Sequence, residues 1–315
     1  MYLPFKIDIY AFLFGLINKN YKNLKKKKEM EKEKVKQQVK TIGEYKVYLE
    51  QELGRGAYGI VYKAIKSADP SILFAIKMLT KKDLNPKIIE RFEELISREI
   101  DVLKDLQHIN IVHLDDVKVT SNNIYLIFEY CSSGSLKGFL DKGSRMTEKE
   151  VVKAVIDLLS GMEYYIKKKI IHRDLKPANI LIGEGNQMKI CDFGFGRFVQ
   201  DVNQEAVMTY NVGSPLYLAP EVYKREEYNY KCDIWSLGII FYEMLFGKTP
   251  WHGKSAPDLF TNNIMVKPLD FPDNIPVRKD IKQIIKKILT INQKDRIDIQ
   301  ELKEKLTVIE AELGR

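Results

Sequence analysis

The chain has few cysteines and no apolar run long enough to cross a membrane. Its three cysteines, Cys131, Cys191 and Cys232, are scattered over 315 residues and form no CxxC pair. This pattern argues against a disulfide framework and a cysteine-based zinc site, and it favours a reducing, cytoplasmic compartment. The densest apolar run, Ile9 to Ile17, is well short of the roughly 20 residues that a membrane-spanning helix needs. No small-residue cleavage site follows this run, so a secretory signal is not expected.

Excess positive charge is absent outside one segment. Of the net charge of +8, residues 1–40 carry +7, with 11 Lys against 4 Asp or Glu, whereas the remainder has 40 Lys or Arg against 39 Asp or Glu. A nucleic-acid-binding face on the folded body is therefore not expected. We interpret residues 1–44 as a basic N-terminal extension that is solvated and either disordered or helical. Two alternatives stay open: residues 1–40 rest weakly on an anionic membrane surface, peripheral to it, or the protein's true start lies further along the chain.

The distribution of β-forming and helical patterns divides the rest of the chain. Short runs of β-formers with turn signals fill residues 45–130, interrupted by one helical pattern from Pro86 to Leu106. From about Leu136 a helical periodicity dominates. The sequence therefore predicts an α+β fold with a small β-rich N-lobe (45–130), a larger, mainly helical C-lobe (131–308) and a short C-terminal tail (309–315). The expected strands are Tyr45–Leu53, Ile60–Ile65, Leu73–Met78, Val112–Val119 and Ile124–Tyr130.

A glycine-rich segment with glycines at Gly54, Gly56 and Gly59 lies between the first two expected strands. In a dinucleotide-binding fold a helix would follow such a motif, but residues 60–64 read as a strand. The chain also contains no Walker A motif, which excludes the P-loop nucleotidases. The segment therefore predicts a β-hairpin lid whose backbone N–H groups approach phosphate oxygens.

Lys77 stands at the end of an expected strand, where its ammonium can hold phosphate oxygens of a nucleotide. In the helix that follows, Glu99 shares one stripe with Phe92, Ile96 and Leu103, at helical spacing. A carboxylate on an otherwise apolar stripe is costly to bury unless it is paired. We therefore predict an ion pair between Glu99 and Lys77; the alternative is a surface lysine and an edge glutamate.

The segment from His172 to Leu181, with the sequence HRDLKPANIL, gathers groups that suit phosphoryl transfer. Asp174 is the candidate base that accepts and orients a substrate hydroxyl, and Lys176 can reach the γ-phosphate. Asn179 offers an amide oxygen to Mg²⁺. Asp192, in the triplet Asp-Phe-Gly, supplies the main carboxylate ligand, and hard oxygen ligands of this kind suit Mg²⁺.

These motifs occur in a fixed order, and Ala219-Pro-Glu221, Asp233-Ile-Trp-Ser-Leu-Gly238 and Arg296 follow them. Over residues 45–308 the chain resembles the eukaryotic protein kinases of the serine/threonine type. The resemblance implies a two-lobed fold that binds ATP and Mg²⁺ between the lobes and transfers the γ-phosphoryl group to hydroxyls of protein substrates. Residues 213–221, 231–238 and 246–251 are similar to the autophagy-initiating Unc-51-like group.

The same resemblance places the adenine of ATP between apolar side chains and beside the segment that joins the lobes. The residues concerned are Leu53, Val61, Ala75, Glu129, Cys131 and Leu181, of which Glu129 and Cys131 would offer backbone groups. It also implies that His172 and Phe193 stack in a buried hydrophobic column.

Three further residues have structural roles in the family that the chain resembles. Asp233 is expected to hold the backbone near His172 and Arg173. Glu221 and Arg296 are expected to form a buried ion pair.

Substrate choice and control are also implied by resemblance. Lys176 and Ser214 are typical of kinases that phosphorylate serine and threonine. Where related kinases place acidic residues to select an arginine three residues before the target, this chain has Ser135 and Ala178. We therefore expect no strong preference for that arginine.

Arg173, next to Asp174, resembles the arginine of kinases that are activated by phosphorylation of a loop. Thr209 is the preferred site and Tyr210 the second; the alternative is an unmodified hydroxyl. No regulatory domain is evident, so regulatory protein partners are expected to contribute. A catalytically inactive scaffold is the competing class of function, and it is disfavoured because Lys77, Asp174 and Asp192 are all present.

Overall fold

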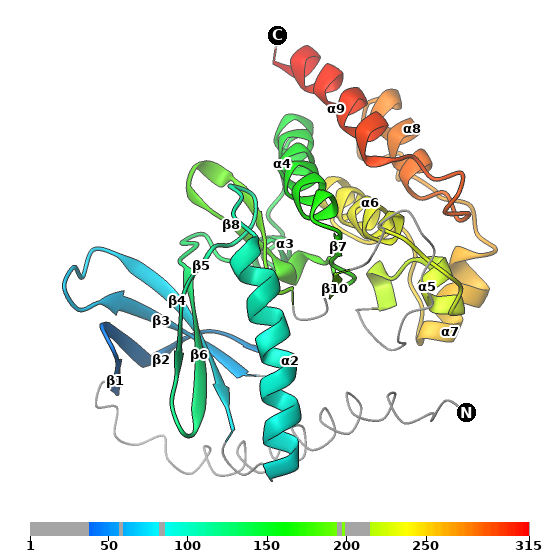
Figure 1. Ribbon diagram of the computed structural model, residues 1–315. Helices are drawn as coiled ribbons and strands as arrows, with labels where there is room; N and C mark the ends of the chain where they lie inside the picture. The colour runs from blue at the N-terminus through cyan, green and yellow to red at the C-terminus, as the bar shows by residue number, and fades with distance from the viewer. Residues whose placement is uncertain (1–37, 57–58, 82–85, 194–196, 199–214, 315) are drawn as a thin grey trace, which may run out of the picture. The chain divides into compact units, whose positions relative to one another are not determined.

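The structure is a computed structural model that describes residues 38–56, 59–81, 86–193, 197–198 and 215–314. Its contacts divide the chain into two compact units. One unit contains the chain up to Arg98 together with His113–Tyr130, and the other contains Glu99–Val112 and the chain from Cys131 onward. The first unit is built mainly on strands and the second mainly on helices (Figure 1). This combination confirms the expected α+β class.

Six antiparallel strands form the sheet of the first unit, in the order β1-β2-β3-β4-β6-β5. Their bounds are β1 Val39–Ile42, β2 Tyr45–Gly56, β3 Gly59–Lys66, β4 Leu73–Thr80, β5 Leu114–Val119 and β6 Asn123–Glu129. The last five correspond to the strands that the sequence predicts. β1 is an additional edge strand, and it turns into β2 through Gly43, whose φ of 56° costs little for glycine.

One core cluster of this unit lies on one face of the sheet, where alternate side chains of neighbouring strands meet. Tyr62, Phe74, Ile76 and Ile127 are buried there. Tyr45 packs edge-to-face on Phe74, with the ring centroids 5.2 Å apart. Because the side chains of a strand alternate between the faces, the residues between these core positions are on the opposite face.

Helix α2, Pro86–Asp105, follows β4 and agrees with the predicted helix within one residue. Near its start, the buried Lys81 after β4 donates a hydrogen bond of 2.9 Å to Glu93 of α2. This ion pair ties the end of the strand to the helix inside the first unit.

The second unit contains most of the helices. They are α3 Leu136–Asp141, α4 Glu148–Lys167, α5 Pro220–Lys224, α6 Lys231–Phe246, α7 Ala256–Leu259, α8 Lys279–Ile288 and α9 Ile299–Leu313, with short helical turns η1 Pro177–Asn179, η2 Glu184–Asn186, η3 Pro215–Tyr217 and η4 Phe260–Ile264. Two ribbons accompany them: β7 Ile170–Ile171 with β10 Arg197–Phe198, and β8 Ile180–Ile182 with β9 Met188–Ile190. α4 contacts α6, α9 lies against α4, and α8 lies against α6 (Figure 1).

Helices α4 and α6 form the centre of this unit for different reasons. α4 begins with a capping box in which Thr147 and Glu150 bind each other's backbone N–H groups, and it buries one face. α6 is apolar on all sides and almost wholly buried, as such a helix must be in the interior of a domain. Gly238 allows α8 to approach α6, because a Cβ there would stand 2.3 Å from the side chain of Ile288.

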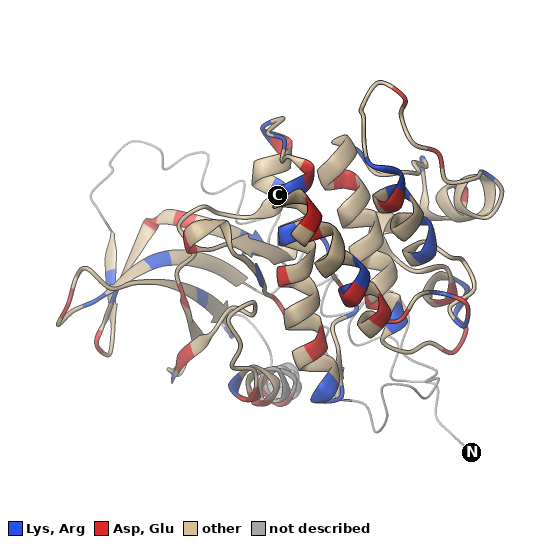
Figure 2. Ribbon diagram, turned by 90° about the horizontal axis from the view of Figure 1, so that it is seen from above, with Lys and Arg blue, Asp and Glu red and all other residues tan. Residues whose placement is uncertain are grey.

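Figure 2 shows basic and acidic residues interspersed along the helices of the second unit. Several of these charges form ion pairs, such as Lys303 of α9 with Glu163 of α4 at 2.5 Å. Within the residues described here, no helix combines the length and the apolar character that crossing a membrane requires.

Candidate active site

Three of the predicted nucleotide-binding residues share one face of the sheet in the first unit. Val61 of β3 is the register partner of Lys77 of β4, and partners on neighbouring strands project to the same side. Ala75 lies two residues before Lys77 and therefore projects to that side as well. All three side chains are half-buried, on the face opposite the cluster that contains Tyr62, Phe74, Ile76 and Ile127. A lysine beside two small apolar side chains suits a nucleotide, because the ammonium can contact phosphate oxygens and the apolar side chains can contact the ring.

The glycine positions differ in what their missing side chains permit. At Gly59 a Cβ would stand 2.3 Å from the carbonyl oxygen of Met78, so the packing of β3 on β4 already requires glycine. At Gly54, which pairs with Val61, no described atom lies within 4 Å of a Cβ position. Gly56 is the last residue of β2. Packing explains Gly59, whereas Gly54 leaves space that a ligand can approach.

The remaining nucleotide-binding candidates lie at several points of the two units. Leu53 on β2 is 44% exposed, and Glu129 ends β6, where its carboxylate accepts a 2.8 Å hydrogen bond from the backbone N–H of His113. In the second unit Cys131 is buried, and Leu181 of β8 is half-buried and bridged to Ser135. Glu99 lies in α2, and its side chain is outside the described part of the structure, so the Lys77–Glu99 pair stays a prediction.

Asp174 is the most constrained of the predicted catalytic residues. It is buried, and its Oδ2 accepts hydrogen bonds from Lys176 Nζ at 2.6 Å and from Asn179 Nδ2 at 3.1 Å. Its Oδ1 is buried and has no hydrogen-bond partner among the residues that the structure describes. A buried acceptor without a partner is costly, and such atoms in native proteins call for an explanation.

Asn179 and Asp192 provide oxygen atoms of the kind that Mg²⁺ prefers. Asn179 is at the end of η1, and its Nδ2 also donates to the backbone oxygen of Asp174 at 2.9 Å. With its nitrogen committed in this way, the amide presents its oxygen as the remaining acceptor. Asp192 follows β9 with an exposed side chain and a φ of 62°. The donor set of these residues therefore fits the hard cation that the sequence implies.

The backbone of the Asp174 loop is held by Asp233, as the resemblance implies. Asp233 is completely buried in the first turn of α6. Its Oδ2 accepts the N–H of His172 at 2.8 Å, and its Oδ1 accepts the N–H of Arg173 at 2.8 Å. Arg173 has a φ of 69°, a left-handed conformation that is unfavourable for any residue with a Cβ.

The imidazole of His172 connects the Asp174 loop to the segment that carries Asp192. Its Nδ1 accepts the backbone N–H of Asp174 at 3.2 Å, so its Nε2 carries the proton and donates to the carbonyl of Cys191 at 3.1 Å. The ring also contacts Phe193 at 4.7 Å between centroids, which agrees with the expected stacking. The loop of Asp174 and the segment of Asp192 are therefore connected through His172 by hydrogen bonds within the second unit.

One buried polar residue at this network, Tyr165 of α4, is missing from the set that the motifs predict. Its hydroxyl donates a 3.0 Å hydrogen bond to Asp233 Oδ2. The signal was available in the sequence, because Tyr165 continues the apolar stripe Val151, Leu158 and Met162 of a helix, and a buried phenol usually needs a partner. The identity of that partner depends on contacts 68 residues apart.

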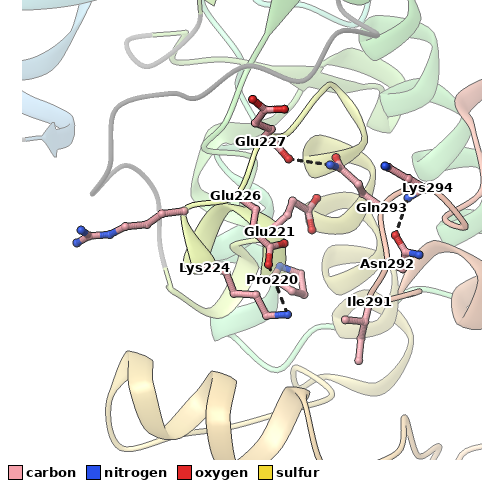
Figure 3. A pocket seen from close by; sticks show the side chains of 10 residues that line it. Pro220, Glu221, Lys224, Glu226, Glu227, Ile291, Asn292, Gln293 and Lys294 are labelled. Atoms are coloured by element: carbon pink, nitrogen blue, oxygen red, sulfur yellow. Dashed lines mark hydrogen bonds and ion pairs between the residues drawn. The ribbon is translucent and has the colours of Figure 1, made fainter.

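A pocket of about 580 Å³ lies elsewhere in the second unit, beside α5 (Figure 3). It is lined by Pro220, Glu221, Lys224, Arg225, Glu226, Glu227, Ile291, Asn292, Gln293 and Lys294. The side-chain nitrogen of Gln293 donates to the carbonyl of Glu227 at 2.7 Å across it. None of the predicted catalytic or nucleotide-binding residues lines this pocket.

Several predicted features lie outside the described residues. They are Thr209 and Tyr210, Ser214, Gly194 of the Asp-Phe-Gly triplet, and residues 1–37 of the extension. Predictions that depend on them stay predictions.

The β-sheet unit, the mainly helical unit that follows it in the chain and the Asp174 loop are together the features expected of a protein kinase domain. The sequence profile described as protein kinase domain matches residues 47–306, and the chain belongs to this family. The resemblance that the ordered motifs indicate is thereby confirmed.

Similar curated proteins carry the names of serine/threonine-protein kinases. Serine/threonine-protein kinase atg1 of Dictyostelium discoideum is 34% identical over 271 residues, which cover 84% of this chain and 39% of that protein. Serine/threonine-protein kinase ULK1 of Homo sapiens is 33% identical over 274 residues, covering 83% and 25%. ULK3 of Homo sapiens is 34% identical over 255 residues, covering 80% and 52%.

These names agree with the expected similarity to the Unc-51-like group, and the chain is similar to that group within the family. It spans from a quarter to about half of the length of these relatives.

Proposed function

We propose that the chain transfers the γ-phosphoryl group of ATP to serine and threonine hydroxyls of protein substrates, with Mg²⁺ as the metal. Membership of the protein kinase family and the names of the relatives support this activity. The observation that carries the proposal is the buried carboxylate of Asp174. One of its oxygens is fixed by Lys176 and Asn179, and the other lacks a hydrogen-bond partner in the described part of the chain.

In this proposal Asp174 Oδ1 accepts the hydrogen of the substrate hydroxyl and orients its oxygen for attack. Lys176, held 2.6 Å from the other oxygen of the same carboxylate, stabilises negative charge on the group in transfer. Asn179 and Asp192 would hold the metal. Mg²⁺ supplies charge neutralisation on the phosphates when it is bound.

Most of the nucleotide contacts in this proposal come from residues of the first unit. Lys77 would hold phosphate oxygens and Glu99 would orient Lys77. Adenine would lie against Val61, Ala75 and the other residues that the resemblance assigns to it. The shared face of Val61, Ala75 and Lys77 supports this assignment.

The test is phosphate transfer from γ-labelled ATP with Mg²⁺ to a generic serine/threonine substrate. The unmodified chain is expected to label serine or threonine, and Asp174→Asn is expected to abolish labelling while nucleotide binding persists. Binding of ATP without any transfer, even after treatment with an activating kinase, would favour the scaffold class instead.

We also propose control by phosphorylation of Thr209, which would pair with Arg173 and order the loop that carries it. The unusual backbone of Arg173 supports a specific role for that residue. The measurement is the site of autophosphorylation by peptide mapping, beside the activity of Thr209→Ala. A fully active Thr209→Ala chain would remove Thr209 from the mechanism.

Residues 1–40, of which Val39 and Lys40 begin β1, have three interpretations, and two of them can be separated by vesicle binding: a solvated extension and a weak contact with an anionic membrane. Their lysines and apolar residues support the second. Sedimentation with phosphatidylserine vesicles separates these two, for the full chain and for a chain lacking residues 1–37, a deletion that leaves β1 intact. Loss of vesicle binding on deletion would favour membrane contact.

A further inference from the structure

Tyr165 has a buried hydroxyl that the chemistry proposed above does not use. The residue is completely buried in α4, and its hydroxyl donates to Asp233 Oδ2 at 3.0 Å. Burial, followed by the negative charge of Asp233, raises the pKa of this phenol well above its ordinary value. The group is therefore a permanent donor at any physiological pH.

The Asp233 carboxylate links the Tyr165 hydroxyl to the backbone of the catalytic loop. The oxygen that accepts from Tyr165 also accepts the N–H of His172, and the other oxygen accepts the N–H of Arg173, both at 2.8 Å. Arg173 sits in a strained left-handed conformation directly before Asp174. A strained backbone of this kind persists only when the surrounding structure holds it in place. The orientation of the Asp233 carboxylate therefore determines the position of the backbone that leads into Asp174.

The ring of Tyr165 reaches the second acidic segment as well. It packs edge-to-face on Phe193, with the centroids 5.7 Å apart and the planes at 81°. Phe193 follows Asp192, and it also packs on His172. The hydroxyl and the ring of one residue therefore contact the supports of both Asp174 and Asp192.

We propose that the Tyr165 hydroxyl is a positioning group for phosphoryl transfer, which fixes the Asp233 carboxylate and through it the strained backbone at Asp174. The inference rests on the proposed kinase activity. Tyr165 touches neither substrate nor nucleotide in this account, so its removal should lower kcat and leave nucleotide binding unchanged. A purely structural role would instead lower stability and leave the kcat of the folded protein unchanged.

The test uses the full chain with Tyr165→Phe, which removes one oxygen and keeps the ring. The neighbouring Tyr164→Phe is the matched control, because its half-exposed hydroxyl is hydrogen-bonded to the backbone of Asp105 and Gln107, away from Asp233. Three quantities are measured for each: kcat, the KM for ATP, and hydrogen exchange of the amides of His172 and Arg173. A third variant, Tyr165→Leu, removes the ring as well as the hydroxyl.

We expect Tyr165→Phe to lower kcat about tenfold, because small misplacements of a catalytic group carry large rate penalties. The KM for ATP should stay unchanged, the amides of His172 and Arg173 should exchange faster, and Tyr164→Phe should match the unmodified chain. Tyr165→Leu should show at least the same loss of kcat.

Two results would overturn the inference while the kinase proposal stands. One is a Tyr165→Phe chain with the kcat of the unmodified protein. The other is a loss of activity in Tyr165→Phe that is accompanied by faster exchange of amides throughout the protein or by failure to fold. In that case Tyr165→Leu should lose more stability and more activity, because it also removes the packing of the ring. An unmodified chain that transfers no phosphate would refute the proposed function itself, and the positioning role with it.

Discussion

Arg296 donates two parallel hydrogen bonds to Glu221 inside the second unit, from Nη1 to Oε1 at 2.7 Å and from Nη2 to Oε2 at 2.9 Å. Both side chains are almost completely buried. The guanidinium also binds the carbonyls of Thr290, Ile291 and Lys231 and lies over the ring of Trp235. The pair that the sequence implies is therefore confirmed, and it joins α5 to the loop before α9.

Replacing Arg296 with methionine should strongly destabilise the fold. The substitution leaves the Glu221 carboxylate buried without its counterion and strips three carbonyls of a donor, and breaking a buried ion pair costs about 3–5 kcal/mol. The measurement is the free energy of unfolding in urea. Lys137→Met is the control, since its exposed ion pair with Asp141 should contribute less than about 0.5 kcal/mol. Similar losses in both variants would contradict this account.

Lys176 is predicted to act on the rate of transfer more than on nucleotide binding. Its ammonium is fixed 2.6 Å from Asp174 Oδ2, and loss of one preorganised donor at a reacting group costs on the order of 10²–10³ in kcat. Lys176→Met should show this loss with a KM for ATP close to that of the unmodified chain. Lys168→Met, which removes an ammonium bound to Asp105 at the surface, should retain its activity. Equal kinetics for the two variants would remove Lys176 from the mechanism.

The ion pair between α4 and α9 predicts a specific dependence of stability on pH. Hydrogen bonds from Lys167 and Lys303 lower the pKa of Glu163 in the folded chain. Because the folded pKa is depressed, this contribution is present above the unfolded pKa of about 4.3 and is lost as the pH falls through the folded value. Glu163→Gln should therefore lower the unfolding free energy more at pH 7 than at pH 3.

Urea titrations at the two pH values measure this difference for Glu163. Lys303→Met should lose part of the same pH dependence, because it removes one of the two donors. A cost of Glu163→Gln that is equal at both pH values would show that the carboxylate gains nothing from its lysines.

Substrate selection should not depend on an arginine three residues before the target. Ser135 is uncharged and caps α3, accepting the N–H of Gly138 at 3.1 Å, and the side chain of Ala178 is an exposed methyl. A positional peptide library should therefore show no enrichment of arginine there.

A gain-of-function variant makes this substrate prediction sharper. Ala178→Glu should raise kcat/KM for an arginine-containing peptide by about two- to fivefold, the range that one exposed ion pair provides. Selection of arginine by the unmodified chain would mean that other acidic residues supply the contact.

Much of the fold and the chemistry follows from local patterns. The strands from Tyr45 to Glu129 and helix α2 appear where β-forming runs and a helical stripe predict them, because alternation and helical spacing depend on neighbours only. The motifs at Asp174 and Asp192 are enough to identify the family from the sequence. The reactive residues of each motif lie close together in the chain, so their chemistry can be recognised from the sequence without the fold.

The tertiary structure decided which distant groups meet. Nothing local to Tyr165 indicates that its hydroxyl binds Asp233, 68 residues away, and nothing local to Arg173 predicts its positive φ. The tautomer of His172 likewise depends on the N–H of Asp174 and the carbonyl of Cys191. Residue type and spacing alone were enough to predict five of the six strands of the large sheet, helix α2, the family and the reactive groups. Hydrogen bonds between separate segments depend on how the helices and loops pack. The packing therefore fixed the orientation of the reactive groups, which residue type and spacing do not specify.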